Sequence, residues 1–422
     1  MQTKHNSTVG ENWLYIKHKS GLTIQILKKP SKSRICAQIA TRFGSINREF
    51  VCDGQTVIVP NGTAHFLEHK LFEGKEGNAF DYYAKTGAKA NAFTSNDKTA
   101  YYFTCSNDFI KNLTVLLTFI SNPYLTDENV EKEKGIIGQE IKMYDDEPSW
   151  QGYFGLVNCL YGTHPVKYDI AGSVEDIAPI TVDTLMSCYN TFYDVSNMVL
   201  SISGDVDENE ILKVCDSVLK TSSGKTITQV IPKEPVGVVK EYFEKTMPVS
   251  RPIFHIGIKD NDTDVDGYAL VKKTMEIEML VEMLFGQASP FYKRLYDKGI
   301  INSEFDAAYE VSNTFAFCCI AGECDNPDAV LTEVKAEIAS LLKNGISDEL
   351  FLQIRNLAYG NIIASLDNVS SVVRNLTNAY FTNSDPYDAA TALKEITAND
   401  ILKRAKELFC PLDIAMSVIK GE

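Results

Sequence analysis

Residues 180–206, ITVDTLMSCYNTFYDVSNMVLSISGDV, hold the pattern that decides the fold, because it returns as ITANDILKRAKELFCPLDIAMSVIKGE at residues 396–422. Each segment has the pattern of an amphipathic helix, a short break and an alternating strand ending in glycine. Residues 80–105 and 291–324 form a second matching pair, each with a helix, a glycine stop and two strands around a polar turn. The copies lie roughly 215 residues apart, so we predict an internal duplication.

The stretch between the copies, TSSGKTITQVIPKEPVG at residues 221–237, has the serine, glycine and proline content of a linker. We therefore predict lobes at residues 1–225 and 241–422, joined by a linker at residues 226–240. In both halves, paired strands alternate with single or paired helices, which is typical of helices layered on a largely antiparallel sheet. The sequence thus predicts an α+β protein of two homologous lobes.

Composition excludes several classes of protein. With 44% hydrophobic and 23% charged residues, the 422-residue chain is ordinary for a globular protein, and its net charge of −15 argues against a nucleic-acid partner. The chain has no signal-type amino terminus and no stretch of about eighteen apolar residues, so we expect a cytoplasmic protein without a membrane partner. Its ten cysteines include no CxxC pair, and we interpret them as small buried hydrophobes rather than disulfides or metal ligands.

The sharpest chemical signal is HFLEH at residues 65–69, in a helix-like stretch that follows the turn residues Pro-Asn-Gly at 60–62. On a helix, His65 and His69 are one turn apart, so both imidazoles can reach one metal ion, and Glu68 faces the same side. The alternative is a pair of core histidines with backbone hydrogen bonds. The pattern favours a zinc site with Glu68 as general base.

A third ligand is expected from TDENVEKEKGIIGQEIKMYDDEP at residues 126–148, which has a threonine cap, acids in the first turn and a terminal proline. Glu133 and Glu140 fall on the apolar stripe of this predicted helix rather than on its lysine face. Buried carboxylates need compensation, and a dication provides it for at least one of them. The alternative is that each acid lies at the surface edge and pairs with a lysine.

Five segments in this order resemble the pitrilysin/insulinase (inverzincin) zinc peptidase family, and within it a bacterial YmfH-like branch. They are HFLEH, NAFTSNDKTAYYFTC, EKEKGIIGQEIKMYDDEP, YGTHPVKYDIAGSVEDI and FYDVSNMVLSISGDVD, at residues 65–69, 91–105, 131–148, 161–177 and 192–207. The resemblance implies that one zinc ion per chain is held by His65, His69 and Glu140. It also implies that Glu68 is the general base and Glu133 a supporting acid.

The resemblance further implies ferredoxin-like (LuxS/metalloenzyme-like) α/β sandwich units, two in this chain of the four in a closed chamber. The first lobe would then be catalytic, and the second an inactive repeat for substrate enclosure and dimerisation. The strand that begins at Asn91, Ala92, Phe93 and Thr94 resembles the edge strand on which an extended peptide substrate is added. The alternative is that Asn91 only begins a turn.

The second lobe departs from the family pattern. Members that work alone carry an arginine and a tyrosine after a glycine-serine loop, where they grip the substrate backbone. The corresponding stretch here is GQASPFYKRLYDKGIINSEF at residues 286–305, which aligns Tyr296 with the arginine and Asn302 with the tyrosine. We therefore expect a heterodimer with a related subunit that lacks zinc ligands but keeps the Arg/Tyr grip; otherwise Arg294 substitutes and the chain is a homodimer.

Together these features predict a zinc metalloendopeptidase that hydrolyses peptides or small unfolded polypeptides. Two alternatives remain open at this point. The chain could be a non-catalytic peptide-binding or structural subunit of the same fold, which needs no intact metal set. It could also be a processing peptidase dedicated to one precursor.

Overall fold

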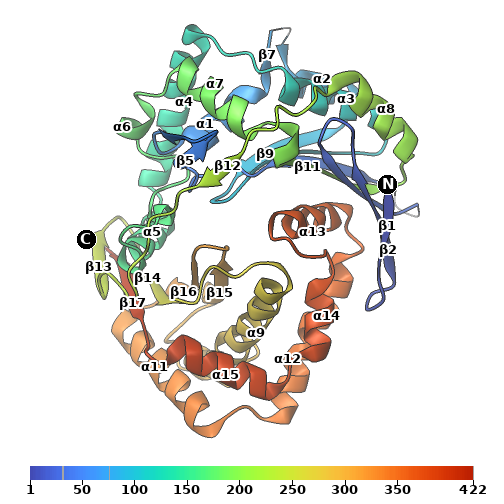
Figure 1. Cartoon of the computed structure of the whole chain (residues 1–422). Helices are drawn as coiled ribbons and strands as arrows, with labels where there is room; N and C mark the ends of the chain where they lie inside the picture. The colour runs from blue at the N-terminus through green and yellow to red at the C-terminus, as the bar shows by residue number, and fades with distance from the viewer. Residues whose placement is uncertain (31–32, 76, 422) are drawn as a thin grey trace. The chain divides into compact units, whose positions relative to one another are not determined.

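The computed structural model describes residues 1–30, 33–75 and 77–421 and divides the chain into two compact units (Figure 1). Unit 1 comprises Met1–Ile141, Tyr168–Ile231 and Ile363–Phe381, and unit 2 comprises Lys142–Lys167, Pro232–Ile362 and Thr382–Glu422. Within the described residues, no helix is long and apolar enough to cross a membrane. The chain passes from unit 1 to unit 2 after Ile141, Ile231 and Phe381, and the second of these crossings falls within residues 226–240.

Unit 1 is built on a seven-stranded sheet in the order β1-β2-β3-β11-β4-β10-β9. The pair β3/β11 is parallel and the other neighbours are antiparallel. The strands are β1 Gln2–Asn6, β2 Glu11–Lys17, β3 Thr23–Lys28, β4 Ile35–Thr41, β9 Lys89–Thr94, β10 Thr99–Cys105 and β11 Met198–Gly204. Smaller sheets are formed by β5 Glu49–Cys52, β6 Gln55–Ile58 and β12 Ile227–Gln229, and by β7 Glu73–Gly74 and β8 Gly77–Asn78.

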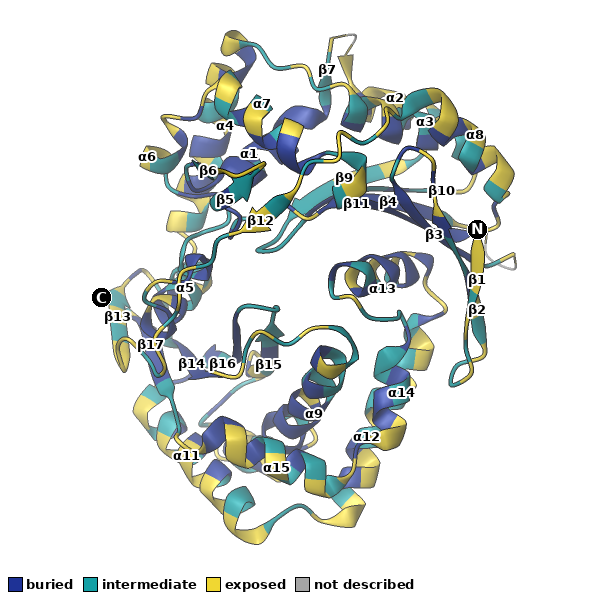
Figure 2. Cartoon of the chain, in the orientation of Figure 1, coloured by how far each residue is buried: buried dark blue, intermediate teal, exposed yellow. Residues whose placement is uncertain are grey.

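The central strand β11 is buried on both faces, as Figure 2 shows. Leu200 and Ile202 point into the main core, to which helices also contribute. The helices of unit 1 are α1 Thr63–Leu71, α2 Ala79–Thr86, α3 Phe109–Ser121, α4 Asp127–Asp145, α6 Val174–Ile177, α7 Val182–Phe192, α8 Glu208–Val218 and α13 Val369–Phe381. The last turn of α4, after Ile141, belongs to unit 2. On the other face, Ser201 accepts a hydrogen bond from Thr377 of α13 at 3.0 Å, so this helix covers a partly polar sheet surface.

Unit 2 contains a five-stranded sheet in the order β13-β17-β14-β16-β15, again with one parallel pair, β13/β17. Its strands are β13 Tyr242–Thr246, β14 Ile253–Lys259, β15 Asp306–Val311, β16 Ala316–Glu323 and β17 Ile414–Lys420. Its helices are α5 Pro148–Leu160, α9 Gly267–Phe285, α10 Pro290–Asp297, α11 Pro327–Asn344, α12 Asp348–Ser365, α14 Asp388–Glu395 and α15 Ala398–Phe409. The last residues of α12, after Ile362, belong to unit 1. Glycines bring α5 close to the sheet, since a Cβ at Gly155 would lie 2.4 Å from Phe243 Cδ1.

The duplication predicted from the sequence is confirmed by the two sheets. The order β3-β11-β4-β10-β9 in unit 1 repeats as β13-β17-β14-β16-β15 in unit 2. The predicted helix-break-strand segments are α7 with β11 and α15 with β17, and the second pair is α2-β9-β10 and α10-β15-β16. The α+β class is confirmed as well. One helix is exchanged in each direction, because α5 from the first half of the sequence belongs to unit 2 and α13 from the second half belongs to unit 1.

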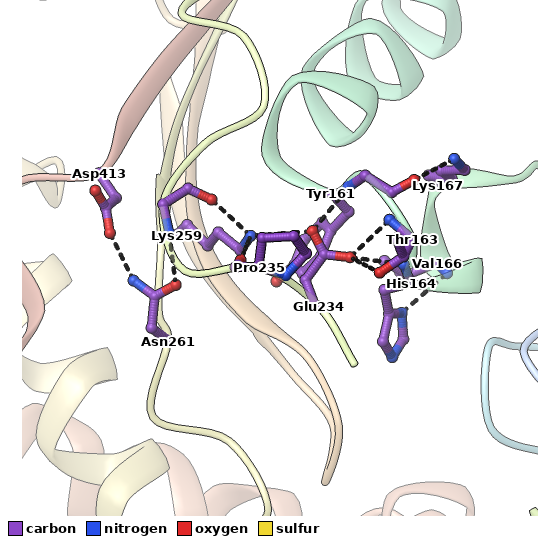
Figure 3. Close-up of polar contacts among 12 residues, drawn as sticks. Tyr161, Thr163, His164, Val166, Lys167, Glu234, Pro235, Lys259, Asn261 and Asp413 are labelled. Carbon is purple, nitrogen blue, oxygen red and sulfur yellow. Dashed lines mark hydrogen bonds and ion pairs between the residues drawn. The ribbon is translucent and has the colours of Figure 1, made fainter. Parts of the chain in front are cut away.

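A carboxylate fixes the start of the second half within unit 2 (Figure 3). Glu234 accepts the backbone N–H groups of Gly162, Thr163 and His164 at 2.7–2.8 Å and the Lys259 ammonium at 3.2 Å. Burial would raise the pKa of Glu234, but the three N–H donors outweigh it and lower the pKa to about 2. This clamp ties the segment after β12 to the end of α5.

Candidate metal centre

Helix α1 is positioned by the turn predicted at residues 60–62. Gly62 adopts a left-handed conformation with φ of 81° immediately before the helix. A Cβ at this position would lie 2.2 Å from the Ala171 carbonyl oxygen, so only glycine allows the approach. Thr63 Oγ1 donates to the Pro60 carbonyl at 2.7 Å, and Asn61 Nδ2 donates to Asp176 at 3.1 Å. The first turn of α1 therefore has a fixed direction.

The two histidines of α1 converge with Glu140 of α4. The ring centroids of His65 and His69 lie 4.6 Å apart. His65 Nε2 is 3.8 Å from Glu140 Oε1, and His69 Nε2 is 3.5 Å from Glu140 Oε2. One ligand atom from each residue lies within 4.8 Å of the other two. The structure thus brings together the three residues that the sequence predicts as metal ligands.

The donor set fits zinc. Two imidazole nitrogens and one carboxylate oxygen form a set found in catalytic zinc sites, which keep a fourth position open. Burial, helped by the charge of His69, lowers the pKa of His65 to about 3, so this imidazole is neutral at physiological pH, as a ligand must be. His65 Nδ1 is buried and has no hydrogen-bond partner among the described residues.

His69 is supported by a second carboxylate. Its Nδ1 lies 3.1 Å from Glu133 Oε1, on the side of the ring opposite Glu140. A carboxylate on the outer nitrogen fixes the tautomer and the ring orientation of a ligating histidine. Burial would raise the pKa of Glu133, but the hydrogen bond from His69 and the charge of Lys70 lower it. Burial likewise opposes protonation of His69, but Glu133 and the neighbouring acids raise its pKa.

Glu68 lies beside this cluster and is only 9% exposed. Its Oε2 accepts a hydrogen bond from Thr94 Oγ1 of β9 at 2.6 Å. Burial raises the pKa of Glu68, against the opposing effects of Thr94 and of the charge on His69. A carboxylate with a raised pKa is better suited to exchange protons near neutral pH than an exposed one.

A cavity of about 540 Å³ adjoins Glu68 and His69. Asn91 and Ala92 of β9 line it, together with Phe72 and other residues of unit 1, including Glu73, Phe80, Lys132, Glu133 and Ile136. Strand β9 is the last strand of its sheet and pairs only with β10 within the described part of the chain.

The four residues predicted to bind substrate on β9 are therefore divided. Asn91 and Ala92 line the cavity, while Thr94 instead contacts Glu68. Phe93 points to the face of the sheet opposite Thr94, where it packs with Ala40 and Phe381.

Three contacts at this site were not expected from the sequence: the hydrogen bond from Thr94 to Glu68, the stacking of Phe72 on Phe80 at 4.5 Å, and the burial of Lys70. A lysine within the otherwise apolar run after His69 was the one available signal for the last of these. Thr94 and its partner Glu68 lie 26 residues apart on different elements. Phe72 follows the end of α1 and Phe80 lies in the first turn of α2, so no helical or strand periodicity indicates either contact.

Comparisons with known proteins agree with this geometry. Residues 59–171 match the sequence model of the insulinase family (peptidase family M16), and residues 179–358 match that of the peptidase M16 inactive domain. The uncharacterized zinc protease YmfH of Bacillus subtilis is 38% identical over 402 residues, covering 93% of this chain and 92% of the relative. The crystal structure of an M16-like peptidase from Alicyclobacillus acidocaldarius superimposes with a TM-score of 0.94 at 33% identity, covering 100% of this chain and 99% of the other. A protease from Helicobacter pylori shares the fold, with a TM-score of 0.81 at 19% identity and coverage of 97% and 100%.

Proposed function

Because this chain belongs to the insulinase family, peptidase family M16, we propose that it is a zinc metalloendopeptidase with His65, His69 and Glu140 as zinc ligands. The observation that carries the proposal is the convergence of these three side chains within 4.8 Å. Glu68 lines a cavity large enough for substrate residues beside the same cluster. An acid, a metal-ligand set and a cavity in one place favour hydrolysis over a purely structural role.

When bound, zinc supplies Lewis acidity, which acidifies a water molecule and polarises the scissile carbonyl. Glu68 takes a proton from the attacking water and later delivers it to the leaving amine. Thr94 donates a hydrogen bond to Oε2 of this carboxylate, which fixes the carboxylate's orientation and leaves Oε1 the freer oxygen for proton transfer. Glu133 keeps His69 in the tautomer with hydrogen on Nδ1, which directs Nε2 toward the ligand cluster.

The proposed substrates are peptides and small unfolded polypeptides. An extended chain adds to the open side of β9 through backbone hydrogen bonds, which places a peptide bond near Glu68. Asn91 and Ala92 contribute to both the strand and the cavity wall. Because backbone pairing reads little of the side chains, we expect broad specificity, although a processing peptidase for one precursor would use the same site.

A two-chain enzyme is the finer proposal, and contacts in unit 2 support it. Arg294, the candidate substitute for the missing arginine, is engaged by Glu333 and Glu337 of α11 at 3.2 and 3.0 Å. Asn302, aligned with the missing tyrosine, donates to Glu323 at 3.2 Å. Tyr296 is half exposed but carries no charge for gripping a carbonyl oxygen. We propose that a related subunit without zinc ligands supplies the Arg/Tyr grip; a homodimer is the alternative.

We also propose a reducing compartment, the cytoplasm, for this enzyme. All ten cysteines are free, and all except Cys52 and Cys410 are buried. Burial raises the pKa of thiols such as Cys188 to about 12, so they remain protonated and unreactive. They act as small core residues.

Metal analysis combined with a Glu68→Gln variant tests the proposed function. We expect one zinc per chain in both proteins, cleavage of a peptide mixture by the wild type, and a loss of at least about a hundredfold in the variant. Unchanged cleavage by the variant would refute the mechanism, and a chain without zinc would favour the non-catalytic alternative. Assays with and without the candidate partner test the two-chain proposal, which full activity of the isolated chain would contradict.

A further inference from the structure

Lys70 occupies an unusual position in α1. Its neighbours Phe66, Leu67 and Leu71 are buried apolar residues, as expected for a helix that faces a core. The side chain of Lys70 is nevertheless only 1% exposed. A buried ammonium group is strongly unfavourable unless carboxylates surround it. We therefore expect carboxylates around the Lys70 ammonium, and their identity indicates the role of this residue.

The Lys70 ammonium contacts two carboxylates from different elements. One is Glu73 of β7, and the other is Glu133 of α4, whose Oε2 lies 3.4 Å from Nζ. Lys70 thus ties α1 to the β7 segment and to α4, the helix that also carries Glu140. Within the described residues, no other side chain makes an ion pair with Glu73.

The two oxygens of Glu133 have different tasks. Oε2 faces Lys70, and Oε1 lies 3.1 Å from His69 Nδ1. The ammonium therefore fixes the rotation of the carboxylate that orients His69. Without it, Glu73 and Glu133 would lose the cation that they share, and their repulsion would favour turning Glu133 toward water. His69 would then lose its hydrogen-bond acceptor.

We propose that Lys70 is a positioning residue for the metal centre: it holds Glu133 so that His69 directs Nε2 toward the ligand cluster. The inference rests on the proposed function, since it concerns the same zinc site. It differs from a purely structural role, in which Lys70 would only neutralise the two neighbouring acids and would leave zinc affinity unchanged once the protein has folded.

The test measures the zinc dissociation constant of the full-length chain by competition with a chromophoric chelator, for the wild type, Lys70→Met and Lys29→Met. Lys29 pairs with Glu11 elsewhere in unit 1 and is 16% exposed, so its variant controls for the loss of a largely buried ion pair. We expect Lys70→Met to weaken zinc binding by about tenfold to a hundredfold, as other losses around metal-ligating histidines do. Lys29→Met should stay within about twofold of the wild type, because its pair has no part in orienting a metal ligand.

Two further measurements keep the result interpretable. The double variant Lys70→Met/Glu73→Gln removes one carboxylate together with the ammonium, so it should fold even where the single variant does not, and the same loss is expected. The visible absorption spectrum of the Co²⁺-loaded protein should change in both Lys70 variants, because it reports ligand geometry. Unchanged zinc affinity in a folded Lys70 variant, or an equal loss of affinity in Lys29→Met, would overturn the role of Lys70 and leave the proposed function standing. A wild-type chain that binds no zinc would overturn the proposed function as well.

Discussion

Replacing Thr94 by valine removes one hydroxyl from the site and keeps the shape of the side chain. Thr94 Oγ1 donates to Glu68 Oε2 at 2.6 Å, and the acceptor carboxylate is 9% exposed. A hydrogen bond to a charged group contributes about 1.5–3 kcal/mol. If that energy holds Glu68 in place for proton transfer, its loss lowers kcat/KM by roughly 10- to 100-fold, at about 1.4 kcal/mol per tenfold change.

The assay is cleavage of a fluorogenic peptide by the zinc-loaded wild type, Thr94→Val, Thr94→Ser and Thr104→Val. The serine variant keeps the hydroxyl and should recover most of the activity. Thr104→Val makes the same chemical change on the neighbouring strand β10, opposite Lys89, and should leave kcat/KM unchanged. If Thr94 acts through Glu68, Thr94→Val has little further effect in a Glu68→Gln background. Independent, additive losses would show that Thr94 does not act through Glu68.

Three other outcomes follow from the structure. Zinc at about a hundred times its dissociation constant should stabilise the protein by about 2.7 kcal/mol. A chelator should reverse this stabilisation and Glu140→Gln should abolish it, as measured by thermal unfolding with and without zinc. Burial lowers the pKa of His255 to about 4, below its unfolded value of 6.5, so its contribution to stability is complete above pH 6.5 and is lost as the pH falls toward 4. Urea unfolding should therefore show a loss of about 2 kcal/mol from this group between pH 7 and pH 5, and His255→Gln should remove that part of the pH dependence. Gly155→Ala forces a Cβ to within 2.4 Å of Phe243 and should destabilise unit 2 by about 1–2 kcal/mol. Gly360→Ala is the control: the new Cβ at Gly360 would meet no neighbouring atom within 4 Å, so this variant should be neutral or stabilising by up to about 1 kcal/mol. Urea unfolding measures the difference in stability between the two variants.

The positions of His65, Glu68 and His69 could be predicted because their information is local, whereas the choice of Glu140 over Glu133 as the third ligand came from the family resemblance. His65, Glu68 and His69 lie on one turn, and Glu140 stands on the apolar stripe of a helix whose start at Thr126 and end before Pro148 were readable from cap and proline signals. Helical periodicity alone brings such side chains to one face. The sequence did not predict which side chain forms a hydrogen bond with Glu68. Thr94 is on an edge strand, and its side-chain direction depends on the register of β9 with β10.

The fold shows a similar division. Repeated patterns in the sequence predict the duplication, because each copy carries its own helix and strand signals. The exchange of α5 and α13 between the units has no such signal. Each helix packs through specific close contacts: Gly152 and Gly155 bring α5 against the sheet of unit 2, and Thr377 donates a hydrogen bond to Ser201 beneath α13. Such contacts join residues far apart in sequence: Gly155 and Phe243 are separated by 88 positions, and Thr377 and Ser201 by 176.

Anomalous diffraction at the zinc absorption edge, from crystals of the purified chain, can locate the zinc ion that we propose is held by His65, His69 and Glu140. We expect one peak per chain, about 2.0–2.2 Å from a nitrogen of each histidine and from a Glu140 oxygen. Glu133 should stay outside the ligand shell, on His69 Nδ1. A peak elsewhere, or none in a protein that still cleaves peptides, would show that these three residues do not hold the catalytic metal.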